Sequence, residues 1–316
     1  MSSTLSRLSI EEIRERYARA EDPVTPQALN KLRRDPRRGV RQIYSTLKKR
    51  YDRDCSERTR LDAMLNFERV LWRAGVERIA GVDEVGMGPL AGPVIAAAVV
   101  FPPHTELPGI DDSKRLDAEQ RETAERAIRE TAVGIGIGRA EVGEIDSINI
   151  YQAGLLAMRR AVEALPLPPQ HVLVDARSIP NVAVPQNSFN KGDGIDFSIA
   201  AASIVAKTHR DRLMSDLARS YPAYGFERHK GYCTPEHQHA IRMHGPCAIH
   251  RQSFTFIREL CGEYSSLFYD LKQRLESASG RELNSLEDEL AECGAALADH
   301  EQRKLKLMLS RRWNRC

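Results

Sequence analysis

The stretch that decides the fold is ERIAGVDEVGMGPLAGPVIAAAVVF, residues 77–101. It contains two apolar segments, 77–85 and 93–101, separated by glycines and prolines, which is typical of neighbouring β-strands. Asp83 and Glu84 stand side by side at the end of the first segment. Acidic side chains are rarely buried unless a positive charge meets them, so this pair predicts a cation or a basic group nearby.

The residues that follow continue with strands and helices. Segments 132–142, AVGIGIGRAEV, and 171–176, HVLVDA, predict two more strands, and the alternating glycines of the first permit close backbone approach. Helices are predicted over 117–130 and 149–165, and the most apolar helix runs from about Ser198 to Pro222. Three strands followed by helix–strand alternation indicate an α/β sandwich with a mixed sheet flanked by helices.

We expect three parts along the chain. Residues 1–74 form a helical, basic N-terminal extension, residues 75–256 form the α/β domain, and residues 257–316 form a helical tail. The tail carries leucines at helical spacing, namely Leu283, Leu286, Leu290 and Leu297.

Composition and charge exclude several classes of protein. No run of about 18 apolar residues is present, which excludes a transmembrane helix. The first 20 residues lack the apolar centre of a secretory signal, so a cytoplasmic location is expected. Six scattered cysteines do not form a disulfide framework. Residues 31–50 contain nine Lys or Arg and one Asp, which suits a polyanion such as nucleic acid, although a solvated helix face explains such a run equally well.

Four acids form a candidate metal site. Asp83 and Glu84 end the first predicted strand, Asp175 ends the fourth, and Asp193 lies in KGDG before the apolar helix. Ligands usually bind at strand ends in α/β proteins, and carboxylates brought together there repel unless they share a proton or a cation. Because Mg²⁺ and Mn²⁺ prefer oxygen ligands, the pattern predicts a divalent metal site.

Successive strand residues point to opposite faces, which is a difficulty for Asp83 and Glu84. Both side chains cannot reach one metal from a regular strand. We therefore expect the chain to leave the strand at Glu84, with Gly86 and Gly88 permitting the turn.

Two further segments carry polar patterns. Ser203, Lys207 and Arg210 share one face of the apolar helix, where two cations beside the acids suit a phosphodiester, while a surface stripe is the alternative. Segment 221–254 mixes aromatic and basic residues, which fits nucleic-acid contact. Its potential zinc ligands match no structural zinc spacing, so zinc is a remote alternative; they are His237, His239, His244, Cys247 and His250.

Seven motifs in this order resemble those of bacterial ribonuclease HII, a type 2 ribonuclease H. They are AGVDEVGMGPLAGPV, DDSKRL, EIDSINIYQAGLLAM, VLVDA, KGD, SIAAASIVAKTHRD and YPAYGFERHKGY with HRQSF. The resemblance covers about residues 77–256, and DPRRGVRQIYSTLKK looks like the N-terminal extension of some bacterial members. It implies a ribonuclease H-like fold with helical N- and C-terminal appendages. It also implies an endonuclease that hydrolyses the RNA strand of RNA–DNA hybrids and nicks DNA duplexes 5′ to embedded ribonucleotides, leaving 3′-hydroxyl and 5′-phosphate ends.

The resemblance also implies roles for single residues. The four acids, Asp83, Glu84, Asp175 and Asp193, are catalytic ligands of Mg²⁺ or Mn²⁺ in a two-metal mechanism. Substrate contacts are implied for the main chain of Gly86, Met87 and Gly88, which reads the 2′-hydroxyl, and for Lys114, Lys207, Arg210 and Tyr232. Among these, Lys207 and Arg210 hold phosphates, and Tyr232 packs against the sugar that follows the ribonucleotide.

One residue departs from the family pattern. The usual motif is Gly-Arg-Gly, and Met87 replaces the arginine here. Because methionine cannot imitate the guanidinium, we predict weaker binding or altered discrimination at a single ribonucleotide, with an intact metal site. A nuclease shifted toward long hybrids is therefore one alternative. A non-catalytic RNA–DNA hybrid-binding protein is another, although the presence of all four acids argues against it.

Overall fold

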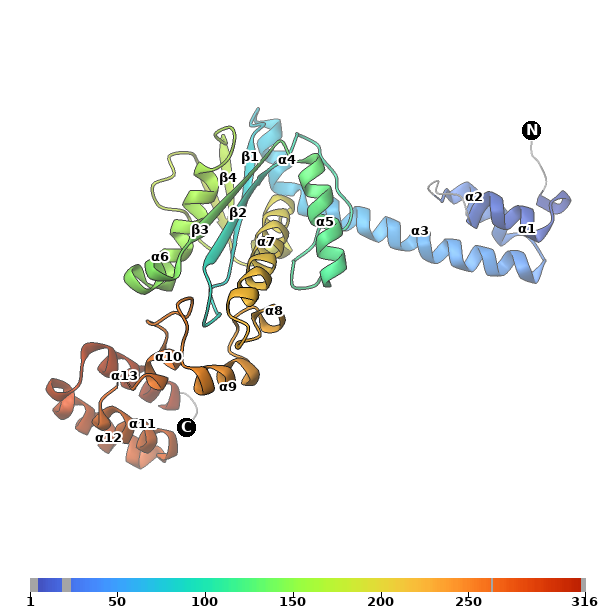
Figure 1. Cartoon of the computed structure of the whole chain (residues 1–316). Helices are drawn as coiled ribbons and strands as arrows, with labels where there is room; N and C mark the ends of the chain where they lie inside the picture. Colours follow the sequence, from blue (N-terminus) through green and yellow to red (C-terminus); the bar gives the residue numbers. More distant parts are fainter. Residues whose placement is uncertain (1–4, 19–23, 263, 314–316) are drawn as a thin grey trace. The chain divides into compact units, whose positions relative to one another are not determined.

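The structure is a computed structural model that describes residues 5–18, 24–262 and 264–313. It contains a five-stranded mixed sheet with the strand order β3-β2-β1-β4-β5 (Figure 1). β1 pairs antiparallel with β2 and parallel with β4, and β4 pairs parallel with β5. The strands are β1 (Ile79–Val85), β2 (Val94–Val100), β3 (Gly134–Ala140), β4 (His171–Asp175) and β5 (Gln186–Phe189). The predicted mixed sheet is confirmed.

Burial explains why the central strands could be recognised. Every residue of β2 is buried, and the first five residues of β1 are buried as well. Strands covered on both faces are continuous apolar runs, which is the pattern seen in these two segments. β5 was not predicted, because its sequence is QNSF and its two central residues are exposed.

Helices cover both faces of the sheet, with α6 on one side and α5 and α7 on the other (Figure 1). Two glycines permit the close approach. A Cβ on Gly81 would lie 2.0 Å from the carbonyl carbon of Ser198 in α7, and a Cβ on Gly138 would lie 1.9 Å from the carbonyl oxygen of Ala157 in α6. The elements are α5 (Ala118–Thr131), α6 (Val142–Glu163), the short η3 (Gly192–Gly194) and α7 (Phe197–Ser220).

The N-terminal region is helical, as predicted. Its own apolar cluster includes Leu29, Leu32, Val40 and Ile43. Its longest helix, α3, ends at Met64, and Leu65 separates it from α4. The elements are η1 (Leu5–Arg7), α1 (Ile10–Ile13), η2 (Arg14–Ala18), α2 (Pro26–Arg33), α3 (Arg38–Met64) and α4 (Asn66–Arg73).

A buried carboxylate joins α4 to the start of α7. Glu68 accepts hydrogen bonds from the N–H of Ser198 at 3.0 Å and from its hydroxyl at 2.7 Å. The first N–H groups of a helix have no partner within the helix, so Glu68 caps α7 from a distant part of the sequence.

The C-terminal region is also helical, as predicted. The tail has an apolar cluster of its own that includes the four leucines singled out in the sequence. The elements are α8 (Phe226–His229), α9 (Pro235–His244), α10 (Thr255–Leu260), α11 (Ser266–Ser277), α12 (Gly280–Glu292), η4 (Cys293–Ala296) and α13 (Asp299–Trp313).

Contacts within the chain define two compact units. The first comprises Met1–Val85, Ile95–Arg139 and Leu155–His209, and the second comprises Gly86–Val94, Ala140–Gly154 and Arg210–Cys316. All four predicted acids lie in the first unit. The second contains the Gly-Met-Gly segment, Arg210 and Tyr232.

Two expectations about the whole chain can be compared with the structure. Within the described ranges, every helix is too short or too polar to cross a membrane. The cysteines in those ranges are free thiols, namely Cys55, Cys233, Cys247, Cys261 and Cys293, and Cys316 lies outside the described residues.

Candidate active site

The parallel pairing of β1 with β4 brings predicted acids together. Val82 lies opposite Val174, and Asp83 and Asp175 are the next residues of their strands. One carboxylate oxygen from each of these two residues and one from Glu84 all lie within 4.8 Å of one another. Among the residues that the structure describes, this is the one group of three or more His, Cys, Asp or Glu side chains with such geometry.

The prediction that the chain leaves the strand at Glu84 is wrong. β1 continues to Val85, with Glu84 opposite Ala96 of β2. The side chains converge although the strand is regular, because Asp83 turns along the chain and accepts a 2.8 Å hydrogen bond from the N–H of Glu84. The backbone reaches a left-handed φ of 96° only at Gly86.

Burial and repulsion raise the pKa of all three carboxyl groups. Burial, followed by the charges of Glu84 and Asp175, holds the pKa of Asp83 well above its usual range. Burial and then the charge of Asp175 raise the pKa of Glu84 to about 7. Burial also raises the pKa of Asp175, although Asp175 accepts a 2.6 Å hydrogen bond from Gly192.

This donor set fits a divalent cation. Oxygen Oε2 of Glu84 is buried, and no hydrogen-bond partner for it exists among the described residues. A buried carboxylate without a partner is costly, and a bound cation would compensate both this oxygen and the repulsion among the three acids. Carboxylate oxygens are also the ligands that Mg²⁺ and Mn²⁺ prefer.

The fourth predicted acid, Asp193, is not in the three-residue group. It is buried in η3, and its Oδ2 accepts a 2.8 Å hydrogen bond from the ammonium of Lys114. Its charge still raises the pKa values of Asp175 and Asp83, so it acts on the group electrostatically. The structure thus pairs two predicted site residues with each other, and metal binding by Asp193 stays a prediction.

Two residues from the predicted polar face of helix α7, Ser203 and Lys207, lie in the same compact unit as the four acids. Ser203 is buried, and its hydrogen bond to Asp83 partly offsets the rise in the pKa of that carboxyl group. Its hydroxyl also lies 2.9 Å from the hydroxyl of Ser113 in the DDSKRL motif, a contact that no sequence pattern predicted. One turn further along the helix, Lys207 is partly exposed.

Arg210 differs from the expectation that it holds phosphates. It is fully buried, and its guanidinium donates hydrogen bonds to the carbonyls of Pro93, Lys230 and Ala91 at 3.1, 3.0 and 3.1 Å. These bonds use three of the five N–H donors of the guanidinium, and the side chain has no exposed surface. Arg210 therefore supports the main chain around the Gly-Met-Gly segment.

A second buried guanidinium, which the sequence reasoning missed, supports the same segment. Arg251 is fully buried and donates to the carbonyls of Gly86 at 2.6 Å, Gly92 at 2.9 Å and Met87 at 3.3 Å. Burial lowers the pKa of Arg251 to about 9. Its place in the quoted HRQSF motif was the only signal in the sequence.

The Gly-Met-Gly segment has close neighbours in its own unit. A Cβ on Gly88 would lie 3.8 Å from the ring of Tyr232, which is 40% exposed. The sulfur of Met87 lies 3.0 Å from the position of a Cβ on Gly154 in α6. Met87 thus packs over a glycine, and Gly88 leaves the tyrosine ring free of a side chain.

Three histidines of segment 221–254 contact one another, and among the described residues they are not part of a group with metal-site geometry. Nε2 of His237 lies 3.0 Å from Nε2 of His250, and the ring of His229 stacks on His237 at 4.4 Å. Burial lowers the pKa values of His237 and His250 to about 4, so both are neutral at pH 7.

A mixed α/β sheet that brings three carboxylates together at the ends of two parallel strands offers the ligands of a metal-dependent enzyme. Comparison with known proteins gives the family. A family model described as Ribonuclease HII matches residues 80–257, and a model described as Ribonuclease HII N-terminal domain matches residues 9–72. The chain belongs to the ribonuclease HII family, and the predicted enzyme class, a metal-dependent endonuclease of the ribonuclease H type, is confirmed.

Individual relatives are similar over most of the chain. Ribonuclease HII of Myxococcus xanthus is 50% identical over 259 residues, which cover 82% of this chain and 88% of the relative. Ribonuclease HII of Geobacillus thermodenitrificans is 51% identical over 234 residues, or 74% of this chain and 90% of the relative. The crystal structure of ribonuclease H2 from Pyrococcus horikoshii OT3 is 24% identical with a TM-score of 0.49, and the match covers 59% of this chain and 98% of that one.

Proposed function

We propose that this enzyme hydrolyses the RNA strand of RNA–DNA hybrids and nicks DNA duplexes on the 5′ side of embedded ribonucleotides. The observation that carries the proposal is the convergence of Asp83, Glu84 and Asp175 at adjacent strand ends, where one buried oxygen of Glu84 has no hydrogen-bond partner within the described part of the chain. The identity of about one half to proteins named Ribonuclease HII supports the substrate class.

The three converging acids would hold Mg²⁺ or Mn²⁺, with Asp193 as the fourth acid. Bound divalent ions supply activation of the attacking water and stabilisation of the leaving 3′ oxygen, which leaves 3′-hydroxyl and 5′-phosphate ends. The protein supplies orientation. The N–H of Glu84 and the hydroxyl of Ser203 hold the Asp83 carboxylate, and Lys114 holds that of Asp193.

Substrate contacts belong to the same proposal. Lys207 holds a backbone phosphate, and the Gly86–Gly88 main chain and Tyr232 recognise the ribonucleotide, since only a 2′-hydroxyl distinguishes RNA from DNA. The carbonyls of Gly86 and Met87 already accept from Arg251, which holds them in place for this task.

The N-terminal region supplies sequence-independent affinity in this proposal. Its exposed cations attract phosphates and make binding sensitive to salt; they are Lys31, Arg33, Arg34, Arg38, Arg41 and Lys49. Separate apolar clusters in the N-terminal helices and in the tail support a division into 1–74, 75–256 and 257–316, with 75–256 as the catalytic domain. A cytoplasmic location fits a substrate in chromosomal DNA.

A nicking assay tests the proposal. The substrates are a DNA duplex with one ribonucleotide, a duplex with several consecutive ribonucleotides, and a long RNA–DNA hybrid, each with Mg²⁺, Mn²⁺ or a chelator. We expect metal-dependent cleavage 5′ to the lone ribonucleotide with a 3′-hydroxyl product. Binding without cleavage in every metal would favour the non-catalytic alternative. Cleavage confined to long hybrids would favour the shifted specificity suggested by Met87.

A further inference from the structure

We propose that Glu57 and Arg60 of helix α3 are positioning residues that hold Lys114 at the active site. This inference rests on the proposed function, which places Lys114 and Asp193 at the site of cleavage. It gives the N-terminal region a second task besides attracting nucleic acid, because α3 would set the geometry of a catalytic-domain loop.

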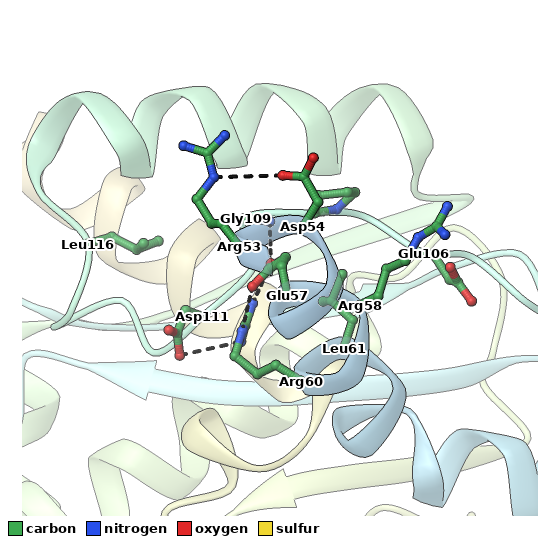
Figure 2. Close-up of a pocket in the computed structure, with 11 residues that line it drawn as sticks. Arg53, Asp54, Glu57, Arg58, Arg60, Leu61, Glu106, Gly109, Asp111 and Leu116 are labelled. Carbon is green, nitrogen blue, oxygen red and sulfur yellow. Dashed lines mark hydrogen bonds and ion pairs between the residues drawn. The ribbon is translucent and has the colours of Figure 1, made fainter. Parts of the chain in front are cut away.

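The first step is the set of bonds between α3 and the loop of residues 101–117, which joins β2 to α5 and contains Lys114 (Figure 2). Arg60 donates a 2.6 Å hydrogen bond to the carbonyl of Ile110. Its guanidinium also lies 3.6 Å from the carboxylate of Asp111, a pair that is drawn in Figure 2. Glu57 accepts a 3.0 Å hydrogen bond from the N–H of Gly109. A 2.7 Å ion pair joins Glu57 to Arg60, so the two side chains form one bracket.

The second step is the series of hydrogen bonds within the loop, which connects Asp111 to Lys114. The carboxylate of Asp111 accepts from the N–H of Asp112 at 2.8 Å, and the carboxylate of Asp112 accepts from the N–H of Lys114 at 2.9 Å. Between them, the hydroxyl of Ser113 lies 2.9 Å from that of Ser203. A shift at residues 109–111 therefore moves the backbone from which Lys114 reaches Asp193.

The third step is the open space between α3 and the loop. A cavity of about 590 Å³ lies between them, lined by Leu61 and charged residues of α3 and by Glu106, Pro108, Gly109, Asp111 and Leu116 of the loop region (Figure 2). At this cavity the two segments are not closely packed, and the hydrogen bonds and ion pairs of Glu57 and Arg60 span from one to the other. The Arg60 guanidinium also holds the pKa of Glu57 below its usual range, so the bracket is charged at neutral pH.

A double-mutant cycle tests the inference with the full chain. Arg60→Ala, Lys114→Ala and the double variant are compared by kcat/KM on the duplex with one ribonucleotide. We expect Arg60→Ala to reduce kcat/KM by about 10-fold in the unaltered enzyme, because small misplacements of an active-site group are costly. In the Lys114→Ala enzyme it should reduce kcat/KM by less than about 2-fold, since residues that act through one another are not additive.

Matched variants separate positioning from folding. Arg58 lines the same cavity on the same helix, so Arg58→Ala removes an equal charge. It should leave kcat/KM within about 2-fold of the unaltered enzyme. Glu57→Gln keeps an acceptor for the N–H of Gly109 and should retain more activity than Glu57→Ala. Hydrogen exchange of amides 109–116 should accelerate in Arg60→Ala, while the melting temperature of the protein stays unchanged.

The outcomes distinguish this inference from the proposed function. Equal losses from Arg60→Ala in both backgrounds, or full activity of Lys114→Ala, would overturn the positioning role alone. Failure of the unaltered enzyme to cut at ribonucleotides with any divalent metal would instead contradict the proposed function. In that case hydrogen exchange still tests the bracket, because unchanged exchange of amides 109–116 in Arg60→Ala would overturn it.

Discussion

Asp83 and Asp175 directly follow the paired residues Val82 and Val174 at the carboxyl ends of two parallel strands. The register of the sheet, and not a flexible loop, therefore sets the separation of these two backbone positions. The positions cannot move apart without breaking strand pairing, so a proton or a cation is needed to compensate the repulsion of the two carboxylates.

Neutralising one acid should remove catalysis and relieve this repulsion. We predict that Asp83→Asn lowers cleavage at least about 10³-fold, because several kcal/mol of transition-state stabilisation depend on the metal. The asparagine oxygen can still accept from the N–H of Glu84, so hybrid binding should be retained. The free energy of unfolding in chelator should rise by about 1–3 kcal/mol, measured by urea denaturation. Asp216→Asn on the exposed side of α7 is the control, and full cleavage by Asp83→Asn would contradict the assignment.

Metal should stabilise the folded protein through the same acids. At a free Mg²⁺ or Mn²⁺ concentration about 100 times the dissociation constant, stability rises by about 2.7 kcal/mol, or several degrees in Tm. Thermal unfolding with a chelator and with each metal measures this difference. The shift should be absent in Asp83→Asn. A shift of the same size in that variant would place the metal elsewhere.

Lys207 and Arg210 should respond differently to substitution. In an Asp83→Asn background, Lys207→Ala should reduce the slope of log K against log salt by about one unit for the hybrid, as expected for one lost phosphate contact. Arg210→Lys should leave that slope unchanged. It should lower the free energy of unfolding by about 2–4 kcal/mol, because a lysine cannot replace all three hydrogen bonds that the guanidinium donates to buried carbonyls. The opposite pattern would restore Arg210 as a phosphate ligand.

Met87 should determine the preference between substrates. We predict that Met87→Arg raises kcat/KM for a single ribonucleotide relative to a long hybrid by about 10-fold, the effect of one charge-assisted contact. Met87→Leu is the matched control, since leucine keeps an apolar side chain over Gly154. An unchanged ratio for Met87→Arg would show that the missing guanidinium does not explain specificity.

The buried histidine pair should make stability depend on pH. His237 and His250 titrate at about 4 in the folded protein and near 6.5 when unfolded, so the unfolded chain binds more protons between these values. Stability should therefore fall as pH decreases from 6.5 to about 4, by up to about 1.4 kcal/mol per pH unit for each histidine. Urea denaturation at several pH values measures the slope. His237→Gln should reduce it, whereas His239→Gln on the exposed side of the same helix should not.

The sequence allowed those parts of the fold to be predicted that local composition determines. β1 to β4 are apolar because the sheet buries them, and the glycines at positions 136 and 138 marked the close approach of α6. β5 was missed because an exposed edge strand of polar residues pairs through its backbone alone. The end of β1 was misplaced by one residue, since the rotamer of Asp83 could not be read from strand periodicity.

The candidate site was predictable in residue type but not in every partner. Three carboxylates were brought together as expected. Helical spacing placed Arg210 on a polar face, but it could not show that the carbonyls of Ala91 and Pro93 would lie against that face. The bracket formed by Glu57 and Arg60 joins residues about 50 positions apart, and no periodic pattern reports such a pairing.

The cap that Glu68 places on α7 changes how a truncated enzyme should be understood. A chain beginning at residue 75 would leave the N–H and the hydroxyl of Ser198 without this acceptor, at the start of the helix that carries Ser203 and Lys207. Lost activity after such a deletion would then reflect lower stability of the catalytic domain as much as weaker binding of nucleic acid. Only charge substitutions on the exposed surface of the N-terminal helices would separate the two effects.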